Sequence, residues 1–155
     1  MTRLRPKNFL WLFTIILISG CSYDVVKTEP ESFDDKSPVT IFANANGGNK
    51  GLLNFNGPVY VHLGLITDSS INPNHWRYVK FSWGSEDEQA RAKPAGNNKW
   101  SYTIPNIRSF FGVPEKEKIL QLAVLFRQGG CIDTFCLALR NVDRTDIFLP
   151  VKGEK

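Results

Sequence analysis

Apolar and polar residues alternate along much of this chain, and this alternation predicts β-strands. Between residues 59 and 65 every second residue is a branched aliphatic one, and the residues in between are Tyr60, His62 and Gly64. A period of two places successive side chains on opposite faces of a strand, so one face of this strand is expected to be buried. The pattern therefore predicts a sheet that covers a hydrophobic core.

Short runs of the same kind recur as far as residue 151, separated by clusters of Gly, Asn, Pro and Asp that favour turns. We expect strands at residues 39–43, 59–66, 76–81, 90–93, 99–104, 119–127, 137–140 and 146–151. The exception is the stretch 106–111, where Asn106 is expected to cap a single helical turn. Seven to eight strands in about 115 residues predict an all-β, immunoglobulin-like β-sandwich.

The first 20 residues follow a different pattern. An apolar run from residue 9 to residue 18 follows the basic Arg3, Arg5 and Lys7. The run is much shorter than the roughly 20 apolar residues that a transmembrane helix needs. Basic residues before a short apolar run are typical of a secretory signal peptide, so we expect residues 1–20 to be removed on export. A buried first helix is the alternative.

The sequence Ile18-Ser19-Gly20-Cys21 ends the apolar run and resembles the lipobox of bacterial lipoproteins. In that motif the cysteine is acylated and becomes the first residue of the mature protein. We therefore expect Cys21 to carry two or three acyl chains, which anchor a protein stably without a membrane span. An ordinary signal peptide before an unmodified cysteine is the alternative. The residue after Cys21 is Ser22 and not an aspartate. By the usual sorting rule of Gram-negative bacteria this predicts the outer membrane, on its periplasmic or its outer surface.

Removal of the signal peptide changes the charge of the chain. The 19 basic and 15 acidic residues of the whole sequence give a net charge of +4, but only 16 basic residues lie after residue 20. The mature chain is thus close to neutral, which argues against a nucleic-acid partner. About 135 residues suffice for one domain. We expect a lipidated cysteine and flexible polar tether at 21–37, the sandwich at 38–151, and a C-terminal tail at 152–155.

Besides Cys21, the chain has two cysteines, Cys131 and Cys136. An oxidising compartment favours a disulfide between them, which would close a short loop. A metal site or a redox pair is the alternative. Against both, no His lies nearby in the sequence, and the spacing is not the two-residue spacing of zinc or thioredoxin-like motifs.

Several stretches resemble an immunoglobulin-like module found in exported glycan-degrading proteins of Bacteroidetes: "GGNKGL", "GPVYVHLGLITDSS", "WRYVKFSWG", "NKWSYTIPNIRSFFGVPEKEKILQLAVLFR" and "TDIFLPV". That module often precedes an alpha-amylase-type glycosidase domain and is similar to starch-binding modules. The resemblance implies a starch-like polysaccharide as ligand. In this chain no catalytic domain follows, and the loop from Cys131 to Cys136 replaces a turn that is usually rich in Gly and Asp.

Aromatic side chains offer a surface for a sugar, because flat rings suit the apolar face of a pyranose while polar neighbours bind its hydroxyls. In the expected strand 76–81, Trp76, Tyr78 and Lys80 share one face. His62 would meet that face, and Trp83 lies just beyond the strand. The sequence thus predicts a carbohydrate-binding surface made of His62, Trp76, Tyr78, Lys80 and Trp83.

The alternative for each of these aromatic residues is a place in the core, because sandwich domains commonly bury a Trp of a central strand. Trp100 and Tyr102 alternate with Ser101 and Thr103 and share a face with Ile104. We assign Trp100 and Tyr102 mainly to the core.

Catalysis is not predicted. Glycoside hydrolysis needs two carboxylates held about 5 to 9 Å apart in a cleft, whereas the acidic residues at 86–88, Glu115 and Glu117 have the pattern of solvated surface. A calcium site at 86–88 is an alternative because oxygen ligands are present there. There is no nucleophile elbow and no P-loop, and "GGNKG" favours a turn. We expect no catalytic residue, no metal and no cofactor.

Together these features favour a non-catalytic, lipid-anchored envelope protein that binds an α-glucan-like polysaccharide or assists glycan uptake. The alternative is a structural or protein-docking lipoprotein of the cell envelope with no sugar ligand. A sugar-binding protein should expose aromatic residues, whereas a docking protein should show a larger apolar patch or an open strand edge.

Overall fold

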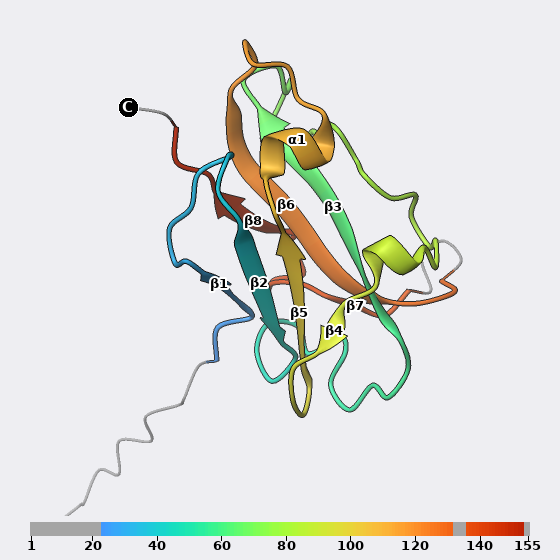
Figure 1. Cartoon of the computed structure of the whole chain (residues 1–155). Helices are drawn as coiled ribbons and strands as arrows, with labels where there is room; N and C mark the ends of the chain where they lie inside the picture. The colour runs from blue at the N-terminus through green and yellow to red at the C-terminus, as the bar shows by residue number, and fades with distance from the viewer. Residues whose placement is uncertain (1–22, 132–135, 154–155) are drawn as a thin grey trace, which may run out of the picture.

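The computed structural model describes residues 23–131 and 136–153, which form two antiparallel sheets packed face to face (Figure 1). The first sheet has the order β1 (Val26–Glu29), β2 (Val39–Asn44), β5 (Lys99–Ile104) and β4 (Lys93–Pro94). The second contains β3 (Val59–Thr67), β6 (Ile119–Gln128), β7 (Ala138–Leu139) and β8 (Ile147–Pro150). The prediction of an all-β sandwich is confirmed.

The strand order is that of a constant-type immunoglobulin sandwich, in which the first, second, fifth and fourth strands form one sheet. β7 and β8 together take the place of the last strand of that fold. Leu139 of β7 pairs with Phe126, and Ile147 of β8 pairs with Val124 on the same strand. Residues 140–146 are therefore an excursion from one interrupted strand, and an ion pair between Arg140 and Asp146 closes it.

The core lies between the two sheets and uses the expected face of β3. Val61, Leu63 and Leu65 are fully buried, together with Phe126 of β6 and Ile41 of β2. Trp100 and Tyr102 of β5 are 6% and 9% exposed, so their assignment to the core is correct. All residues of the buried core lie between residues 33 and 151. A chain that begins at residue 23 therefore contains the whole described core.

The expectation of a flexible tether at 21–37 is wrong for much of that segment. β1 pairs with β2 over four residues, Phe33 is only 4% exposed, and Asp35 is 6% exposed. The Asp35 carboxylate accepts a hydrogen bond from Nε of Arg108 at 2.7 Å. The polar composition was misleading because an edge strand buries only one of its faces and commonly carries charges on the other. Cys21 and the signal peptide lie outside the described residues.

The expected strand at 76–81 is also wrong. Residues 77 to 80 run along the open edge of β3, where Arg77 and Leu65 exchange two backbone hydrogen bonds and Lys80 N donates to Leu63 O. No ladder forms, because Tyr78 has a φ of +52°, in the left-handed region that interrupts the alternation of a strand. The segment covers an edge that would otherwise expose unpaired backbone groups.

The remaining elements agree with the pattern or shift slightly. Asn106 caps α1 (Ile107–Phe111), and its side chain accepts from Ser109 N at 2.8 Å. At residues 90–93 the expected strand is replaced by the end of a 3-10 helix, η1 (Glu88–Ala90), and the start of β4. Within the described ranges, no helix is long and apolar enough to cross a membrane.

Candidate functional site

The outward face of β3 carries an aromatic cluster, which we define as His62, Trp76 and Trp83. His62 and Trp76 are stacked, with ring centroids 5.4 Å apart and an interplanar angle of 24°. Trp83 meets His62 edge to face, with centroids 5.0 Å apart and an angle of 89°. The structure therefore brings together three of the five residues that the sequence suggested for a sugar surface.

Gly64 allows Trp76 to lie directly over β3. A Cβ atom at Gly64 would come within 2.9 Å of Cε3 of Trp76, which is closer than real Cβ atoms approach, and would make a tight contact of 3.3 Å with the Arg77 carbonyl oxygen. Phe148 of β8 meets the Trp76 ring edge to face at 6.2 Å. Trp76 is thus held on several sides and is only partly exposed.

Trp83 is the most exposed ring of the cluster, with 38% of its surface accessible. Beneath it lies Arg127 of β6, which is fully buried. The guanidinium carbon is 5.7 Å from the ring centroids of both Trp83 and Tyr60, within the range of cation–π attraction. One side of the Trp83 indole is therefore supported by the protein while another faces solvent.

Arg127 also fastens the loop that carries Trp83. Its Nη2 donates to the carbonyl oxygen of Ser85 at 2.6 Å, and its Nη1 donates to the carbonyl oxygen of Gln128 at 2.9 Å. Arg127 has no carboxylate within ion-pair distance among the described residues. Burial lowers the pKa of Arg127, but arginine stays protonated in proteins. The Arg127 side chain thus interacts with backbone carbonyl groups and aromatic rings rather than with a carboxylate.

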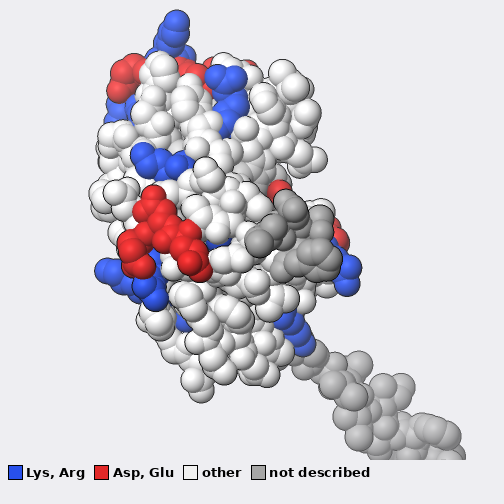
Figure 2. Space-filling model, turned by 90° about the vertical axis from the view of Figure 1, so that its right-hand side faces the viewer, with Lys and Arg blue, Asp and Glu red and all other residues white. Residues whose placement is uncertain are grey.

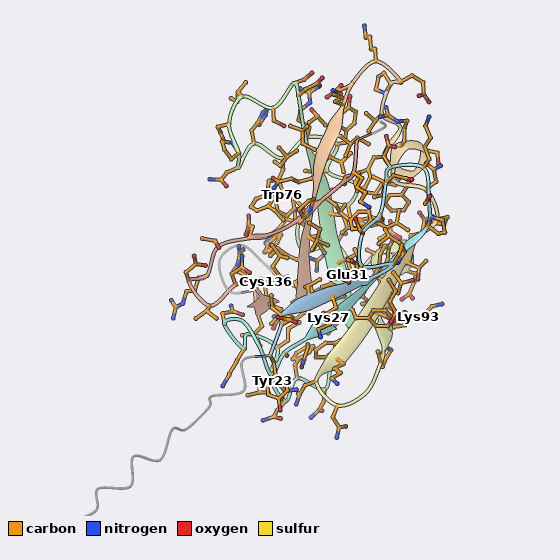
Figure 3. All side chains as sticks on the ribbon, turned by 90° about the vertical axis from the view of Figure 1, so that its left-hand side faces the viewer. Tyr23, Lys27, Glu31, Trp76, Lys93 and Cys136 are labelled. Atoms are coloured by element: carbon orange, nitrogen blue, oxygen red, sulfur yellow. A yellow bond between two sulfur atoms is a disulfide. The ribbon has the colours of Figure 1, made fainter. Side chains whose placement is uncertain are left out.

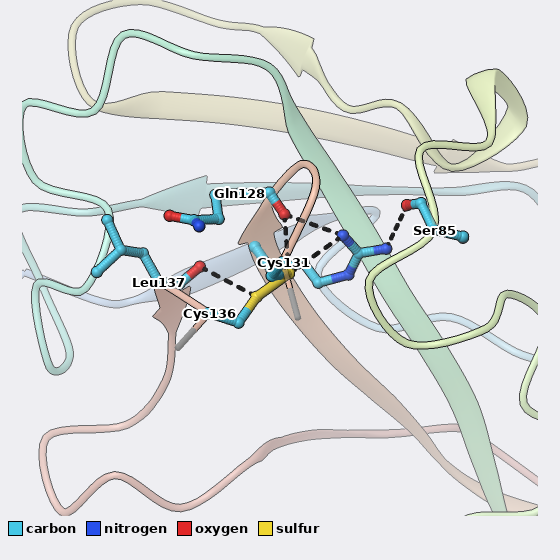
Figure 4. Close-up of a disulfide and its surroundings, with 6 residues drawn as sticks. Ser85, Gln128, Cys131, Cys136 and Leu137 are labelled. Atoms are coloured by element: carbon cyan, nitrogen blue, oxygen red, sulfur yellow. Dashed lines mark hydrogen bonds between the residues drawn. A yellow bond between two sulfur atoms is a disulfide. The ribbon is translucent and has the colours of Figure 1, made fainter. Parts of the chain in front are cut away.

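A disulfide joins Cys131 and Cys136, as predicted, and it borders the same loop (Figure 4). Sγ of Cys131 lies 3.6 Å from Nη1 of Arg127. Gly84, whose φ is +79°, packs so closely that a Cβ there would lie 2.2 Å from the Cys131 carbonyl oxygen. The disulfide, Arg127 and Gly84 together support the position of Trp83.

Tyr78 and Lys80 do not belong to the aromatic cluster, which corrects the predicted surface. The Tyr78 hydroxyl donates to Oε2 of Glu117 at 2.6 Å. Nζ of Lys80 donates to the carbonyl oxygen of Phe110 at 2.8 Å. The same nitrogen lies 4.9 Å from the centroid of the Phe110 ring. The positive φ of Tyr78 is the physical reason, since it removes the common face that a regular strand would have given these side chains.

Glu117 is not the solvated residue that the sequence suggested. Its side chain is 10% exposed, and it accepts hydrogen bonds from Thr67 and Tyr78 beside the guanidinium of Arg77. Burial alone would raise the pKa of Glu117, but the hydrogen bonds from Thr67 and Tyr78 and the charge of Arg77 hold that pKa below its usual value. Glu117 therefore stabilises the fold as a largely, though not fully, buried anion.

The acidic residues at 86–88 are exposed, and two of them have local partners. Asp87 caps η1 by accepting from Gln89 N at 2.8 Å, and Glu88 pairs with Arg91 at 2.8 Å. In residues 23–131 and 136–153, no group of three His, Cys, Asp or Glu side chains is placed to hold a metal ion. Figure 2 shows acidic side chains gathered on this side of the molecule, amid a largely uncharged surface.

His62 is neutral at ordinary pH. Burial, followed by the charges of Arg127 and Arg140, lowers the pKa of His62 to about 4, although a hydrogen bond with the Phe81 backbone opposes the shift. His62 Nδ1, Ser85 Oγ and Arg127 Nε are buried and have no hydrogen-bond partner within the described residues. Such unpaired atoms are uncommon in folded proteins, and these three belong to the cluster and its supporting loop.

We expect acid to destabilise the domain through His62. In the unfolded chain the pKa returns to about 6.5, so between about pH 6.5 and 4 the unfolded state binds more protons and stability falls as pH falls. Because His62 is only partly buried, we expect a loss of about 1–2 kcal/mol between pH 7 and pH 5. Urea unfolding at pH 7 and at pH 5 measures this loss of unfolding free energy. A His62→Gln variant should lack most of this loss, and an equal loss in that variant would contradict the assignment.

Sequence reasoning missed the role of Arg127. The sequence contains one signal, an arginine placed directly after the apolar run 122–126 of the predicted strand, and the structure pairs Arg127 with Tyr60 of β3. An arginine at the end of such a run ordinarily faces solvent. Nothing in the sequence shows that the segment 76–85 folds back over this face and buries the guanidinium.

Comparison with known proteins adds no further assignment. No protein-family model matches the chain, and no curated protein matches it.

Proposed function

We propose that this chain is a non-catalytic, lipid-anchored envelope protein that binds a polysaccharide through the aromatic cluster. The observation that carries the proposal is the meeting of His62, Trp76 and Trp83 on the outward face of β3, with Trp83 38% exposed. A rigid, partly exposed indole suits the apolar face of a pyranose ring. The support from Arg127 fixes Trp83 before binding, which lowers the entropy lost when a ligand binds.

An α-glucan is the ligand class we favour, and this choice depends on the resemblance to starch-binding modules. The test is the migration of the domain spanning residues 23–155 in native gels that contain starch, glycogen, pullulan or a β-glucan. Retardation in the α-glucan gels alone supports the proposal as stated. Retardation in the β-glucan gel alone would contradict the ligand class, and free migration in every gel would contradict polysaccharide binding.

The membrane attachment is proposed from the lipobox-like sequence before Cys21. We expect Cys21→Ala to release the protein from the membrane fraction, because the acyl chains rather than a transmembrane helix would hold it there. The measurement is sedimentation of membranes in high salt, followed by immunoblotting of pellet and supernatant. Ser19→Thr, which leaves Cys21 in place, serves as the matched control. A Cys21→Ala protein that still sediments with membranes would contradict lipidation.

Protein docking is the second candidate function, and one observation favours it. An apolar groove of about 530 Å³ lies between Ile66, Pro73, Leu120 and Pro150, and Leu120 is 45% exposed. Exposed apolar grooves are typical of surfaces that bind other proteins. Free migration of the domain in every polysaccharide gel would make this groove the leading candidate.

A further inference from the structure

A groove of about 500 Å³ lies at one end of the sandwich, between the loop that precedes β3 and the hairpin that joins β4 to β5. Four asparagines line it, Asn54 and Asn56 from the first loop and Asn97 and Asn98 from the second. Phe55 and Trp100 are the aromatic residues of its wall. We call this the asparagine groove; it shares no residue with the aromatic cluster.

The two walls of the groove are fixed to each other. The Asn98 side-chain oxygen accepts a hydrogen bond from Asn54 N at 2.6 Å, and the Asn98 carbonyl oxygen accepts one from Ala45 N at 2.8 Å. The Phe55 ring lies against its own loop, since a Cβ at Gly57 would be only 2.6 Å from its Cζ atom. The groove is therefore preorganised, which reduces the cost of ordering it around a ligand.

Backbone conformation explains two of the asparagines but not the other two. Asn54 and Asn98 each have a φ of +59°, in the left-handed region where Asn is favoured. Asn56 and Asn97 do not have a positive φ, and both are exposed. The hydrogen bonds among the described residues include none from the side-chain amides of Asn56 and Asn97. Two amides that make no hydrogen bond within the described residues thus line the same groove.

The chemistry of the groove selects a neutral ligand rich in hydroxyl groups. Each amide offers two donors and an acceptor, which match hydroxyls that both donate and accept. Lys99 is the single charged residue that lines the groove, so there is no cluster of charge for an ionic ligand. Phe55 adds an apolar ring beside the amides, as sugar sites commonly require.

From this arrangement we propose that the asparagine groove is a second saccharide-binding site of the domain, separate from the aromatic cluster. The inference rests on the proposed function for the choice of saccharide, whereas the groove itself stands on its own geometry. Two separated sites on one domain would let it hold a long polysaccharide at two places, which raises overall avidity when both sites are engaged.

The test follows the side-chain amide signals of the 23–155 domain by ¹H–¹⁵N NMR during titration with maltoheptaose and, separately, cellohexaose, each up to about 10 mM so that millimolar affinity is detected. We expect saturable shifts at Asn56 and Asn97. Asn46 and Asn141 are internal controls, because their amides donate to Asn44 and Thr145 within the protein. No shift at Asn56 and Asn97 with either saccharide, or equal shifts at the control amides, would overturn the inference.

Two variants separate this inference from the proposed function. Asn97→Ala should weaken binding at the groove about fivefold, as expected for one lost hydrogen bond. Trp83→Ala should leave the shifts at Asn56 and Asn97 intact. Shifts of the Trp83 indole without shifts in the groove would overturn the inference and leave the proposed function standing. Shifts in the groove without any at Trp83 would support the inference and contradict the proposed aromatic site.

Discussion

Removal of residues 23–37 is expected to lower the free energy of unfolding of the domain by about 5 kcal/mol or more, comparable with the whole stability of many domains. The deletion removes β1 from the edge of the first sheet and the buried ring of Phe33 from the core. It also leaves Arg108, whose side chain is 12% exposed, without the carboxylate of Asp35. Loss of a buried aromatic ring and of one partner of a buried ion pair each cost about 3–5 kcal/mol, although the two costs are not additive.

Thermal and urea unfolding of the 23–155 and 38–155 fragments, compared side by side, measure this effect. Two point variants localise it. Phe33→Ala should cost about 3–5 kcal/mol, whereas Glu31→Ala, at an exposed position two residues earlier, should change stability by less than about 0.5 kcal/mol. Equal stability of the two fragments would show that residues 23–37 are a tether after all.

Trp83→Ala is expected to weaken polysaccharide binding about 30-fold, which corresponds to the loss of about 2 kcal/mol for a central aromatic contact. The indole is the ring of the cluster with the most accessible surface, and Arg127 and His62 hold it in place. Because the ring is partly solvated, we expect a stability loss smaller than that of a buried Trp. Affinity electrophoresis over a series of polysaccharide concentrations gives the ratio of dissociation constants.

Ile71→Ala is the matched control for this substitution. Ile71 is 82% exposed and takes no part in the aromatic cluster, so its removal should change neither binding nor stability appreciably. Trp76→Ala is less informative, since that ring packs on Gly64, His62 and Phe148 and its loss would disturb the fold. Unchanged binding in the Trp83→Ala protein would place the polysaccharide elsewhere on the domain.

The sandwich was predictable because its core faces follow strict alternation. β5 shows the period of two throughout and β3 shows it from residue 59 to residue 65, and both form strands with the expected residues buried. The helical turn after Asn106 was equally predictable, since an N-cap residue precedes the short segment and a glycine follows it. Residues close together in the sequence determine these elements, so a short stretch of sequence is enough to predict each of them.

Tertiary contacts decide the elements that were predicted wrongly. β1 contributes few apolar residues, and only its pairing with β2 makes it a strand. Tyr78 takes a positive φ because its ring packs against the core and its hydroxyl reaches Glu117, a residue 39 positions away. No local pattern specifies such a contact.

The candidate site was predictable only in part for the same reason. His62 and Trp76 meet because Gly64 leaves space for the Trp76 ring above β3. The alternation along β3 already places Gly64 on the same face as His62, so this space could be predicted. The place of Arg127 beneath Trp83 requires the loop 82–86 to fold against the Cys131–Cys136 disulfide, a long-range contact. The aromatic cluster lies on the outward face of the second sheet. In Figure 3, Trp76 lies beside that sheet, whereas Lys27 and Lys93 lie on the edge strands of the first sheet.

The most direct test of polysaccharide binding at the aromatic cluster is the response of the tryptophan indole signals to maltoheptaose in ¹H–¹⁵N spectra of the 23–155 domain. Three of the four tryptophans lie in this domain, Trp76, Trp83 and Trp100. We expect saturable shifts at Trp83 and, more weakly, at Trp76, whereas a shift at Trp100, which lines the asparagine groove, would report on that groove instead. Trp83 and Trp76 signals that stay fixed, with or without a response at Trp100, would contradict polysaccharide binding at the aromatic cluster.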